Sequence, residues 1–181
     1  MLEVRFHGRG GAGVKTAAQL LGKAAFLSGF QTQDFSLYGA ERRGAPVVSF
    51  TRIDKKKILE RGYITKPDVV VILDDSLDFD RMLKGTDKMT LILVNTNRSH
   101  KLGLDKKENY ICTDATTIAL DIIGRPIPNT VMLGVLVKKL KGKIPFKNLE
   151  EAIEKKMKRY SEKIIEANKR AAKVGYGSIH G

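Results

Sequence analysis

The chain has 181 residues, which is long enough for one well-buried domain and short for two. Hydrophobic residues make up 42% and charged residues 29%, an ordinary globular balance, and the one cysteine excludes a disulfide or an all-cysteine zinc or iron–sulfur site within the chain. No segment approaches the length of a membrane span, and the first residues do not have the pattern of a signal peptide. We therefore expect a cytoplasmic protein.

The net charge is strongly positive, because 33 Lys and Arg residues stand against 20 Asp and Glu residues. The excess lies late in the chain: between Lys138 and Lys173, thirteen basic residues accompany five acidic ones. Such a surplus suggests a nucleic acid as partner. It consists mainly of Lys with interleaved Glu, however, and no zinc-finger, helix-turn-helix or aromatic RNA-reading motif accompanies it. A solvated or partner-facing surface is therefore favoured over nucleic-acid binding.

The first third of the chain predicts a strand, a helix and a hairpin. Alternating residues predict a strand at Leu2–Phe6, and apolar spacings of three and four predict a helix at about 12–28. Strands are expected at Gln33–Tyr38 and Pro46–Asp54, joined by the loop Gly39–Ala45. Seven loop residues are enough for a hairpin and too few for a helical crossover, so these two strands should be antiparallel.

The second half contains continuous aliphatic runs at Val69–Leu73 and Leu91–Val94. Such runs are typical of strands buried on both faces, in a parallel sheet with helices on either side. A shorter strand is expected at Tyr110–Cys112, where the cysteine should be reduced and inert, followed by a helix at Asp114–Ile123.

Two further helices are expected toward the carboxyl end. Asn129 or Thr130 should cap a helix that runs to about Leu140. Asn148 and Glu151 resemble a capping box at the start of a last helical stretch that ends at Gly175, and residues 176–181 should fray. The fold class is thus α/β: a single three-layer domain, residues 1–175, with a mostly parallel sheet and an antiparallel hairpin near the N-terminus.

A glycine loop follows the first strand. Gly8, Gly10 and Gly13 satisfy the G-x-G-x-x-G spacing of dinucleotide-binding proteins, but the expected acidic residue is misplaced: Asp34 lies near the beginning of the second strand rather than at its end. The other phosphate loop, G-x-x-x-x-G-K-[ST], also fails, because Val14 separates Gly13 from the lysine and turns it about 100° around the helix. A nucleotide hydrolase is therefore not favoured.

The number of glycines in this loop has two interpretations. A tight strand-to-helix turn accounts for one or two of them. Four glycines (Gly8, Gly10, Gly11 and Gly13) next to Arg9 indicate that an anion or another chain approaches the backbone closely.

The hairpin loop GAERRGA carries two adjacent arginines, Arg42 and Arg43, after Glu41 and between glycines. Charged residues are normal in a solvated turn, but two arginines on a short loop also form a fork for phosphate or carboxylate.

These two motifs, HGRGGAGVKTAAQLLGKAA from His7 and YGAERRGAPVVSFTRI from Tyr38, together resemble the gamma subunit of 2-oxoacid:ferredoxin oxidoreductases, the pyruvate and ketoisovalerate types in particular. The resemblance covers almost the whole chain in order and continues through segments 66–76, 91–96, 129–136, 166–168 and 175–176. The family usually carries Gln in the glycine loop where this chain has Ala12, so any contact made by that amide is lost here, while the backbone role of the glycines remains.

The resemblance implies a non-catalytic subunit of an enzyme that oxidatively decarboxylates a 2-oxoacid with coenzyme A, giving an acyl-CoA and carbon dioxide, and passes electrons to ferredoxin. Thiamine diphosphate, Mg²⁺ and iron–sulfur clusters are implied for the partners, the alpha, beta and ferredoxin-like delta subunits, with coenzyme A as substrate. This chain should bind no cofactor or metal alone, contact no nucleic acid or membrane, and be inactive when isolated. The oxoacid is selected mostly elsewhere.

The surface expected to face coenzyme A or a partner consists of residues from both loops. These are Gly8, Arg9, Gly10, Gly11, Gly13, Tyr38, Gly39, Glu41, Arg42, Arg43 and Gly44. No catalytic residue is expected, because His7, His100 and His180 lie in unrelated segments and the first of them should be a packed histidine. The alternatives are a stand-alone dinucleotide-binding oxidoreductase and, on charge alone, a nucleic-acid-binding module.

Overall fold

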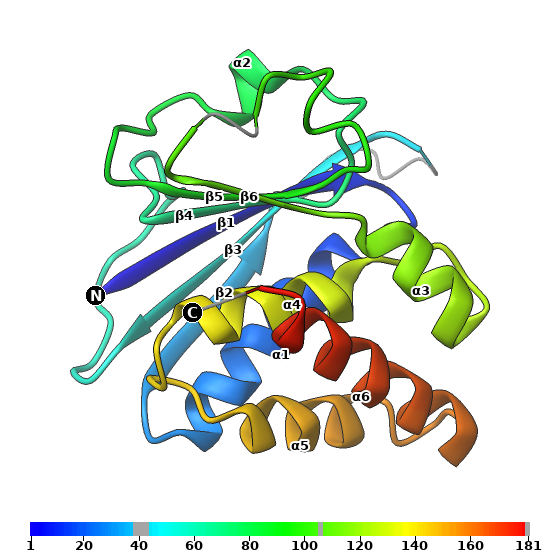
Figure 1. Cartoon of the computed structure of the whole chain (residues 1–181). Coiled ribbons are helices and arrows are strands. Elements are labelled where there is room, and N and C mark those ends of the chain that lie inside the picture. Colours follow the sequence, from blue (N-terminus) through cyan, green and yellow to red (C-terminus); the bar gives the residue numbers. More distant parts are fainter. Residues whose placement is uncertain (38–43, 105–106, 180–181) are drawn as a thin grey trace.

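A six-stranded mixed sheet runs through the centre of the computed structural model, which describes residues 1–37, 44–104 and 107–179 (Figure 1). The strand order is β2-β3-β1-β4-β5-β6. The strands are β1 (Leu2–Arg9), β2 (Gln31–Ser36), β3 (Pro46–Asp54), β4 (Val69–Ile72), β5 (Leu91–Asn95) and β6 (Tyr110–Thr113).

The sheet changes from antiparallel to parallel at β1. This strand pairs antiparallel with β3 over its whole length, from Leu2 opposite Ile53 to Arg9 opposite Pro46, and parallel with β4 on its other edge. Strands β2 and β3 are also antiparallel, whereas β4, β5 and β6 are parallel. The predicted α/β class, the early hairpin and the mostly parallel remainder are confirmed.

The helices lie mainly on one face of the sheet (Figure 1). That face carries α1 (Val14–Leu27), α3 (Ala115–Ile123), α4 (Asn129–Lys139), α5 (Phe146–Lys156) and α6 (Glu162–Gly177). The opposite face is covered by one short helix, α2 (Phe79–Met82), and by connecting segments. No helix in the described ranges is both long and apolar enough to cross a bilayer.

Both faces of the parallel strands are nevertheless buried, which explains their continuous aliphatic sequences. Val69, Val71 and Leu93 belong to the large core under the helices. Val70, Ile72, Ile92 and Val94 form a second core with Met82 of α2 and Leu104. The layers are therefore unequal, because connecting segments supply most of the cover on the second face.

The expected last helical stretch is two helices, α5 and α6, and this part of the prediction was wrong. Pro145 precedes α5, so Asn148 lies inside the first turn, where its amide donates to Ser28 Oγ (2.8 Å) at the end of α1. Its side chain thus joins two helices and does not form a capping box. The expected cap at Asn129 or Thr130 was also wrong. Asn129 is the first residue of α4, and Pro128 precedes it.

Helix α6 continues through Gly177, two residues past the boundary expected at Gly175. The ring of Tyr176 packs against Phe146 of α5, with ring centroids 4.8 Å apart, and Ile179 packs against the main core. The chain therefore stays packed beyond the helix end that the sequence indicates, while residues 180–181 lie outside the described part.

Helices α4 and α6 touch through their backbones. A Cβ added to Gly134 would lie 2.0 Å from the carbonyl oxygen of Ala172, and one added to Gly175 would lie 2.1 Å from that of Val131. Beside this contact the Thr130 hydroxyl donates to Asn168 Oδ1 (3.3 Å), and both residues are buried. Each glycine is therefore required by the close approach of the partner helix.

We expect Gly134→Ala to lower the free energy of unfolding by about 3 kcal/mol, the upper end of the cost of overpacking, because the methyl group would meet a backbone carbonyl. Gly177→Ala is the matched control, since a Cβ there meets nothing within 4 Å. Denaturant unfolding of the isolated chain measures both. Equal stabilities for the two variants would contradict the close helix contact.

Candidate functional site

The glycine loop leaves β1 at the edge of the sheet where the parallel strands end. Strands β1, β4, β5 and β6 run in one direction, so their carboxyl ends share this edge. In open α/β sheets, ligands bind in the crevice beyond such ends. Strand β3 begins at the same place, because Pro46 pairs with Arg9.

Two hydrogen bonds join the glycine loop to the connection between β2 and β3. The backbone N–H of Gly10 donates to the carbonyl of Ala45 (2.8 Å), and that of Gly44 donates to the carbonyl of Gly10 (3.2 Å). The structure therefore brings together the described members of the predicted surface, Gly8, Arg9, Gly10, Gly11, Gly13 and Gly44. The other predicted members, Tyr38, Gly39, Glu41, Arg42 and Arg43, lie outside the described residues.

Arg9 fastens three segments of this edge. Its guanidinium donates to the carbonyl of Gly44 (3.0 Å) and to the hydroxyl of Ser76 (3.1 and 3.2 Å), and its Nε lies 3.3 Å from a carboxylate oxygen of Asp74. Asp74 and Ser76 follow β4, so the side chain links the ends of β1 and β4 to the hairpin connection. Much of its donor capacity is used within the chain, although the side chain stays 40% exposed.

Gly8, Gly11 and Gly13 are required at their positions in the loop for structural reasons that differ. A Cβ on Gly8 would lie 2.7 Å from Val14 Cγ2, and one on Gly13 would lie 2.3 Å from the Asn129 amide, so both serve close packing. Gly13 also has φ +77°, and Gly11 has φ +105°. Beside Gly11, however, the space within 4 Å of a Cβ is open. Gly11 is thus the glycine whose surroundings leave room for an approaching group.

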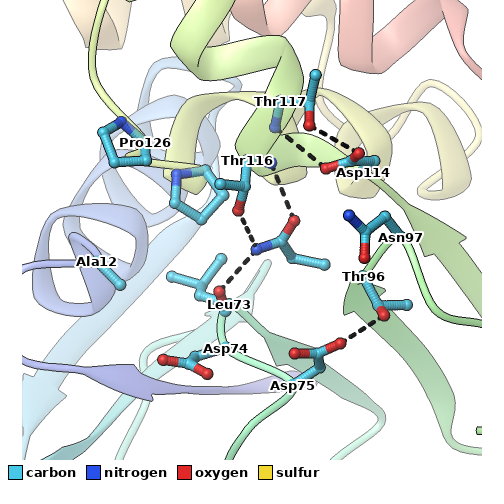
Figure 2. Close-up of a pocket in the computed structure, with 12 residues that line it drawn as sticks. Ala12, Leu73, Asp74, Asp75, Thr96, Asn97, Asp114, Thr116, Thr117 and Pro126 are labelled. Carbon is cyan, nitrogen blue, oxygen red and sulfur yellow. Dashed lines mark hydrogen bonds between the residues drawn. The ribbon is translucent and has the colours of Figure 1, made fainter.

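A pocket of about 370 Å³ opens next to this loop (Figure 2). Its lining residues come from the ends of β4, β5 and β6 and from the segments around α3. They are Ala12, Leu73, Asp74, Asp75, Asn95, Thr96, Asn97, Asp114, Thr116, Thr117, Pro126 and Pro128. Figure 2 shows Asp74 and Asp75 on one side and Asp114 with Thr117 on the other. Ala12, in place of the Gln usual in the resembling family, contributes only a methyl group to the wall.

Sequence reasoning did not identify the residue that organises the pocket. The Asn95 amide donates to the carbonyl of Leu73 and to the hydroxyl of Thr116, both at 2.8 Å, and its oxygen accepts from the backbone N–H of Thr116 (3.1 Å). It therefore ties the ends of β4 and β5 to the first turn of α3. The sequence feature that could have indicated Asn95 is its place as a polar residue directly after the aliphatic run Leu91–Val94.

The pocket is rich in hydrogen-bond acceptors and negative charge. Asp75 pairs with Arg98 (2.8 Å) and accepts from the Thr96 hydroxyl, while Asp114 caps α3 by accepting from the N–H of Thr117 (3.1 Å). With Asp74, three carboxylates line one small cavity. Two of these carboxylates are ion-paired, Asp74 with Arg9 and Asp75 with Arg98, while no lysine or arginine is among the residues that line the pocket.

The geometry also tests the dinucleotide-binding alternative. Strand β3 lies between β1 and β2, so the strand after the first helix does not neighbour β1 as that motif requires. Asp34 pairs with Thr51 in the ladder, and its carboxylate would lie 3.2 Å from a Cβ on Gly22 in the middle of α1. It is therefore in the wrong place to bind a ribose beside the glycine loop.

His7 lies on the face of β1 opposite the helices and is 7% exposed. Burial, with a smaller contribution from the charge of Arg5, lowers its pKa from 6.5 to about 4. Its Nε2 has no hydrogen-bond partner in the described part of the chain. This is the packed histidine that the sequence indicates, and it is neutral at pH 7.

The whole chain matches known proteins. Residues 3–178 match the family model described as "Pyruvate ferredoxin/flavodoxin oxidoreductase". The "Pyruvate/ketoisovalerate oxidoreductases common subunit gamma" of Pyrococcus furiosus is 46% identical, over 97% of this chain and 96% of the relative.

Two solved structures share the fold. Pyruvate oxidoreductase subunit PORC from Thermotoga maritima superposes with a TM-score of 0.82 at 39% identity, covering 97% of this chain and 95% of that one. A 2-oxoglutarate:ferredoxin oxidoreductase from Magnetococcus marinus gives a TM-score of 0.78 at 18% identity, over 99% of this chain and 31% of that chain. At that identity the second likeness shows the fold alone.

The buried, neutral His7 predicts a pH-dependent stability. Because its folded pKa is depressed, its contribution is complete above pH 6.5 and is lost as pH falls toward 4, by up to about 3 kcal/mol. The free energy of unfolding, measured from pH 7 to pH 4, should fall less steeply in His7→Gln than in the wild type. Parallel pH profiles would contradict the depressed pKa.

The glycine loop predicts unequal costs for two alanine substitutions. Gly13→Ala combines a positive φ with a clash against Asn129 and should cost about 3 kcal/mol, whereas Gly11→Ala meets only the strain of its φ and should cost about 1–2 kcal/mol. Melting curves of the two isolated variants measure the difference. A less stable Gly11→Ala variant would show that the open side of the loop is misassigned.

Proposed function

The chain belongs to the pyruvate ferredoxin/flavodoxin oxidoreductase family as a gamma subunit, and we propose that the edge built from the glycine loop and residues 38–45 forms one wall of the cleft through which coenzyme A reaches the active site. The proposed reaction is the oxidative decarboxylation of pyruvate or a related 2-oxoacid with coenzyme A, giving acyl-CoA and carbon dioxide and passing electrons to ferredoxin.

The observation that carries the proposal is the pairing of two distant motifs. The backbone of Gly10 is hydrogen-bonded to Gly44 and Ala45, and Arg9 donates to the same connection. The arginines at positions 42 and 43 directly precede Gly44 in the chain. The described part of this rim leaves open space beside Gly11, and the proposal adds the guanidinium groups of Arg42 and Arg43 to it.

Charge decides which part of coenzyme A this rim would contact. Coenzyme A carries several phosphate charges, and the neighbouring pocket is lined by carboxylates and by no lysine or arginine. We place the phosphates outside the pocket, at Arg42 and Arg43, where guanidinium groups can bind phosphate oxygens in pairs. The Magnetococcus enzyme that shares this fold was solved with coenzyme A bound, which supports such a role.

The redox chemistry is proposed for the other subunits. An iron–sulfur cluster is usually held by four cysteines, and this chain has one, Cys112, which is half-buried on β6 beside the second core. Within ranges 1–37, 44–104 and 107–179, no group of three or more His, Cys, Asp or Glu side chains is arranged to hold a metal. We assign thiamine diphosphate, Mg²⁺ and the clusters to cytoplasmic alpha, beta and delta partners, as the resemblance to the family implies.

The residues of this chain contribute by holding the parts of this edge in fixed positions. Asn95 and Arg9 hold the ends of three strands, the first turn of α3 and the hairpin connection in one arrangement. A rim ordered in this way would bind coenzyme A without first having to become ordered, which lowers the cost of binding.

The test replaces both arginines of the hairpin loop. In the assembled enzyme, Arg42→Ala/Arg43→Ala should raise the KM for coenzyme A about tenfold, the loss of about 1.4 kcal/mol of binding, or lower the yield of assembled enzyme. The melting temperature of the isolated subunit should not change, because the sequence predicts a solvated loop here and surface substitutions are usually within about 0.5 kcal/mol of neutral. Steady-state kinetics and gel filtration are the measurements.

The control is Arg159→Ala/Arg170→Ala, which removes two exposed arginines from the region of α5 and α6 and should leave KM and assembly unchanged. Normal KM and normal assembly in the Arg42/Arg43 variant would overturn the cleft role. Binding of NAD or NADP by the isolated chain would instead favour the dinucleotide alternative.

A further inference from the structure

A second, larger recess lies at the opposite edge of the sheet, where β1 begins. Figure 1 marks that end of β1 with the N-terminus. The recess has a volume of about 770 Å³. Apolar side chains from the starts and ends of several elements form its floor: Leu2, Phe30, Ile53, Leu140 and Ile144. We call it the amino-edge recess. Ligands of α/β sheets bind at the other edge, so a catalytic role is not expected here.

The lining of the amino-edge recess has a net positive charge, because three lysines and the Met1 amine stand against Asp54 and Asp68. Lys55, Lys56 and Lys143 line it, and none of their ammonium groups forms an ion pair with any residue that the structure describes. The two carboxylates at the rim are already engaged. Asp54 pairs with the terminal amine of Met1 (2.9 Å), and Asp68 accepts from the N–H of Glu3 (2.7 Å). An occupant with negative charge is therefore favoured.

An exposed apolar segment adjoins the recess. The chain continues from Lys56 into residues 57–64, which we call the Leu59 arm. Leu59 is 68% and Tyr63 is 61% exposed, which is unusual for large apolar side chains. Three residues of chain span at most about 10 Å, so Leu59 lies close to the lysines of the rim. Tyr63 stacks on Phe50 on the α2 face of the sheet, whereas Leu2 and Ile53 of the recess face the larger group of helices, so the arm and the recess lie on either side of this edge and Lys55 and Lys56 connect them.

Two buried arginines hold the Leu59 arm in place. Arg52, 3% exposed, donates to the carbonyl of Gly62 (3.0 Å), and Arg5, 7% exposed, donates to that of Ile64 (3.3 Å). Tyr63 also stacks on Phe50, with ring centroids 5.8 Å apart. The end of the arm, residues 62–64, is therefore held before any partner binds, so Tyr63 is presented at little entropic cost.

We propose that the amino-edge recess and the Leu59 arm form a second docking surface, which binds an acidic segment with an apolar anchor residue from another subunit of the same enzyme. The apolar anchor fills the recess, and acidic side chains beside it pair with the three rim lysines. The identification of the partner as an enzyme subunit rests on the proposed function. The surface itself lies at the edge opposite the coenzyme A rim and is independent of it.

The first experiment reverses charge at the rim. The alpha, beta and delta subunits are co-expressed with this chain carrying an affinity tag, and the subunits that it retains are identified and quantified. Lys55→Glu/Lys56→Glu should lower their retention at least tenfold. Lys163→Glu/Lys173→Glu makes the same change in net charge at two exposed positions of α6 and should retain them as the wild type does.

The second experiment removes the apolar anchor point. Leu59→Ser should also lower retention at least tenfold, whereas Leu120→Ser, at a 51% exposed leucine on α3, should not. Melting temperatures of the isolated variants should equal that of the wild type, since both leucines are exposed. Full retention by Leu59→Ser and by Lys55→Glu/Lys56→Glu would overturn the docking surface.

These experiments distinguish a failure of the docking proposal from a failure of the coenzyme A proposal. Variants of the amino-edge recess should lower assembly, while the fraction that does assemble keeps the wild-type KM for coenzyme A. A raised KM in that fraction would contradict a purely docking role. Failure of the coenzyme A proposal would appear in the Arg42/Arg43 variant alone, with retention in the recess variants still reduced.

Discussion

The pairing of β1 on both of its edges is the constraint on which the other features depend. One edge is antiparallel with β3 and the other is parallel with β4. The antiparallel edge brings the start of β3 beside the end of β1, and the parallel edge brings the end of β4 there as well. Arg9 closes this junction through Gly44, Asp74 and Ser76. The meeting of the two sequence motifs thus follows from strand direction.

Local signals predicted most of the fold, and tertiary contacts account for what they missed. The glycine loop, the hairpin and the aliphatic strands have short-range patterns, and each was found within a few residues of its bounds. The division between α5 and α6 was missed because no glycine or proline marks it and because Asn148 resembles a capping residue. Asn95 could not be assigned to the pocket, since its partners on β4 and α3 come together only in the folded chain.

The total charge of +13 does not show that different charged side chains line the two edges of the sheet. The pocket at the carboxyl edge is lined by carboxylates, whereas the recess at the amino edge is bordered by lysines. Each edge nevertheless carries both signs, because Asp74 and Asp75 pair with arginines and Asp54 and Asp68 also line the recess. A net charge alone favours any anionic partner, but these surfaces restrict where each kind of partner is stabilised.

The contact between Gly13 and Asn129 has a consequence for how this chain can change over evolutionary time. The glycine begins α1, and the asparagine is the first residue of α4, 116 positions further along the chain. A smaller residue at position 129 would remove the clash of a side chain at position 13 but not the strain of its φ of +77°, so both the backbone conformation and the distant asparagine restrict position 13 to glycine. The conformation of the loop therefore depends on a side chain at the start of a distant helix.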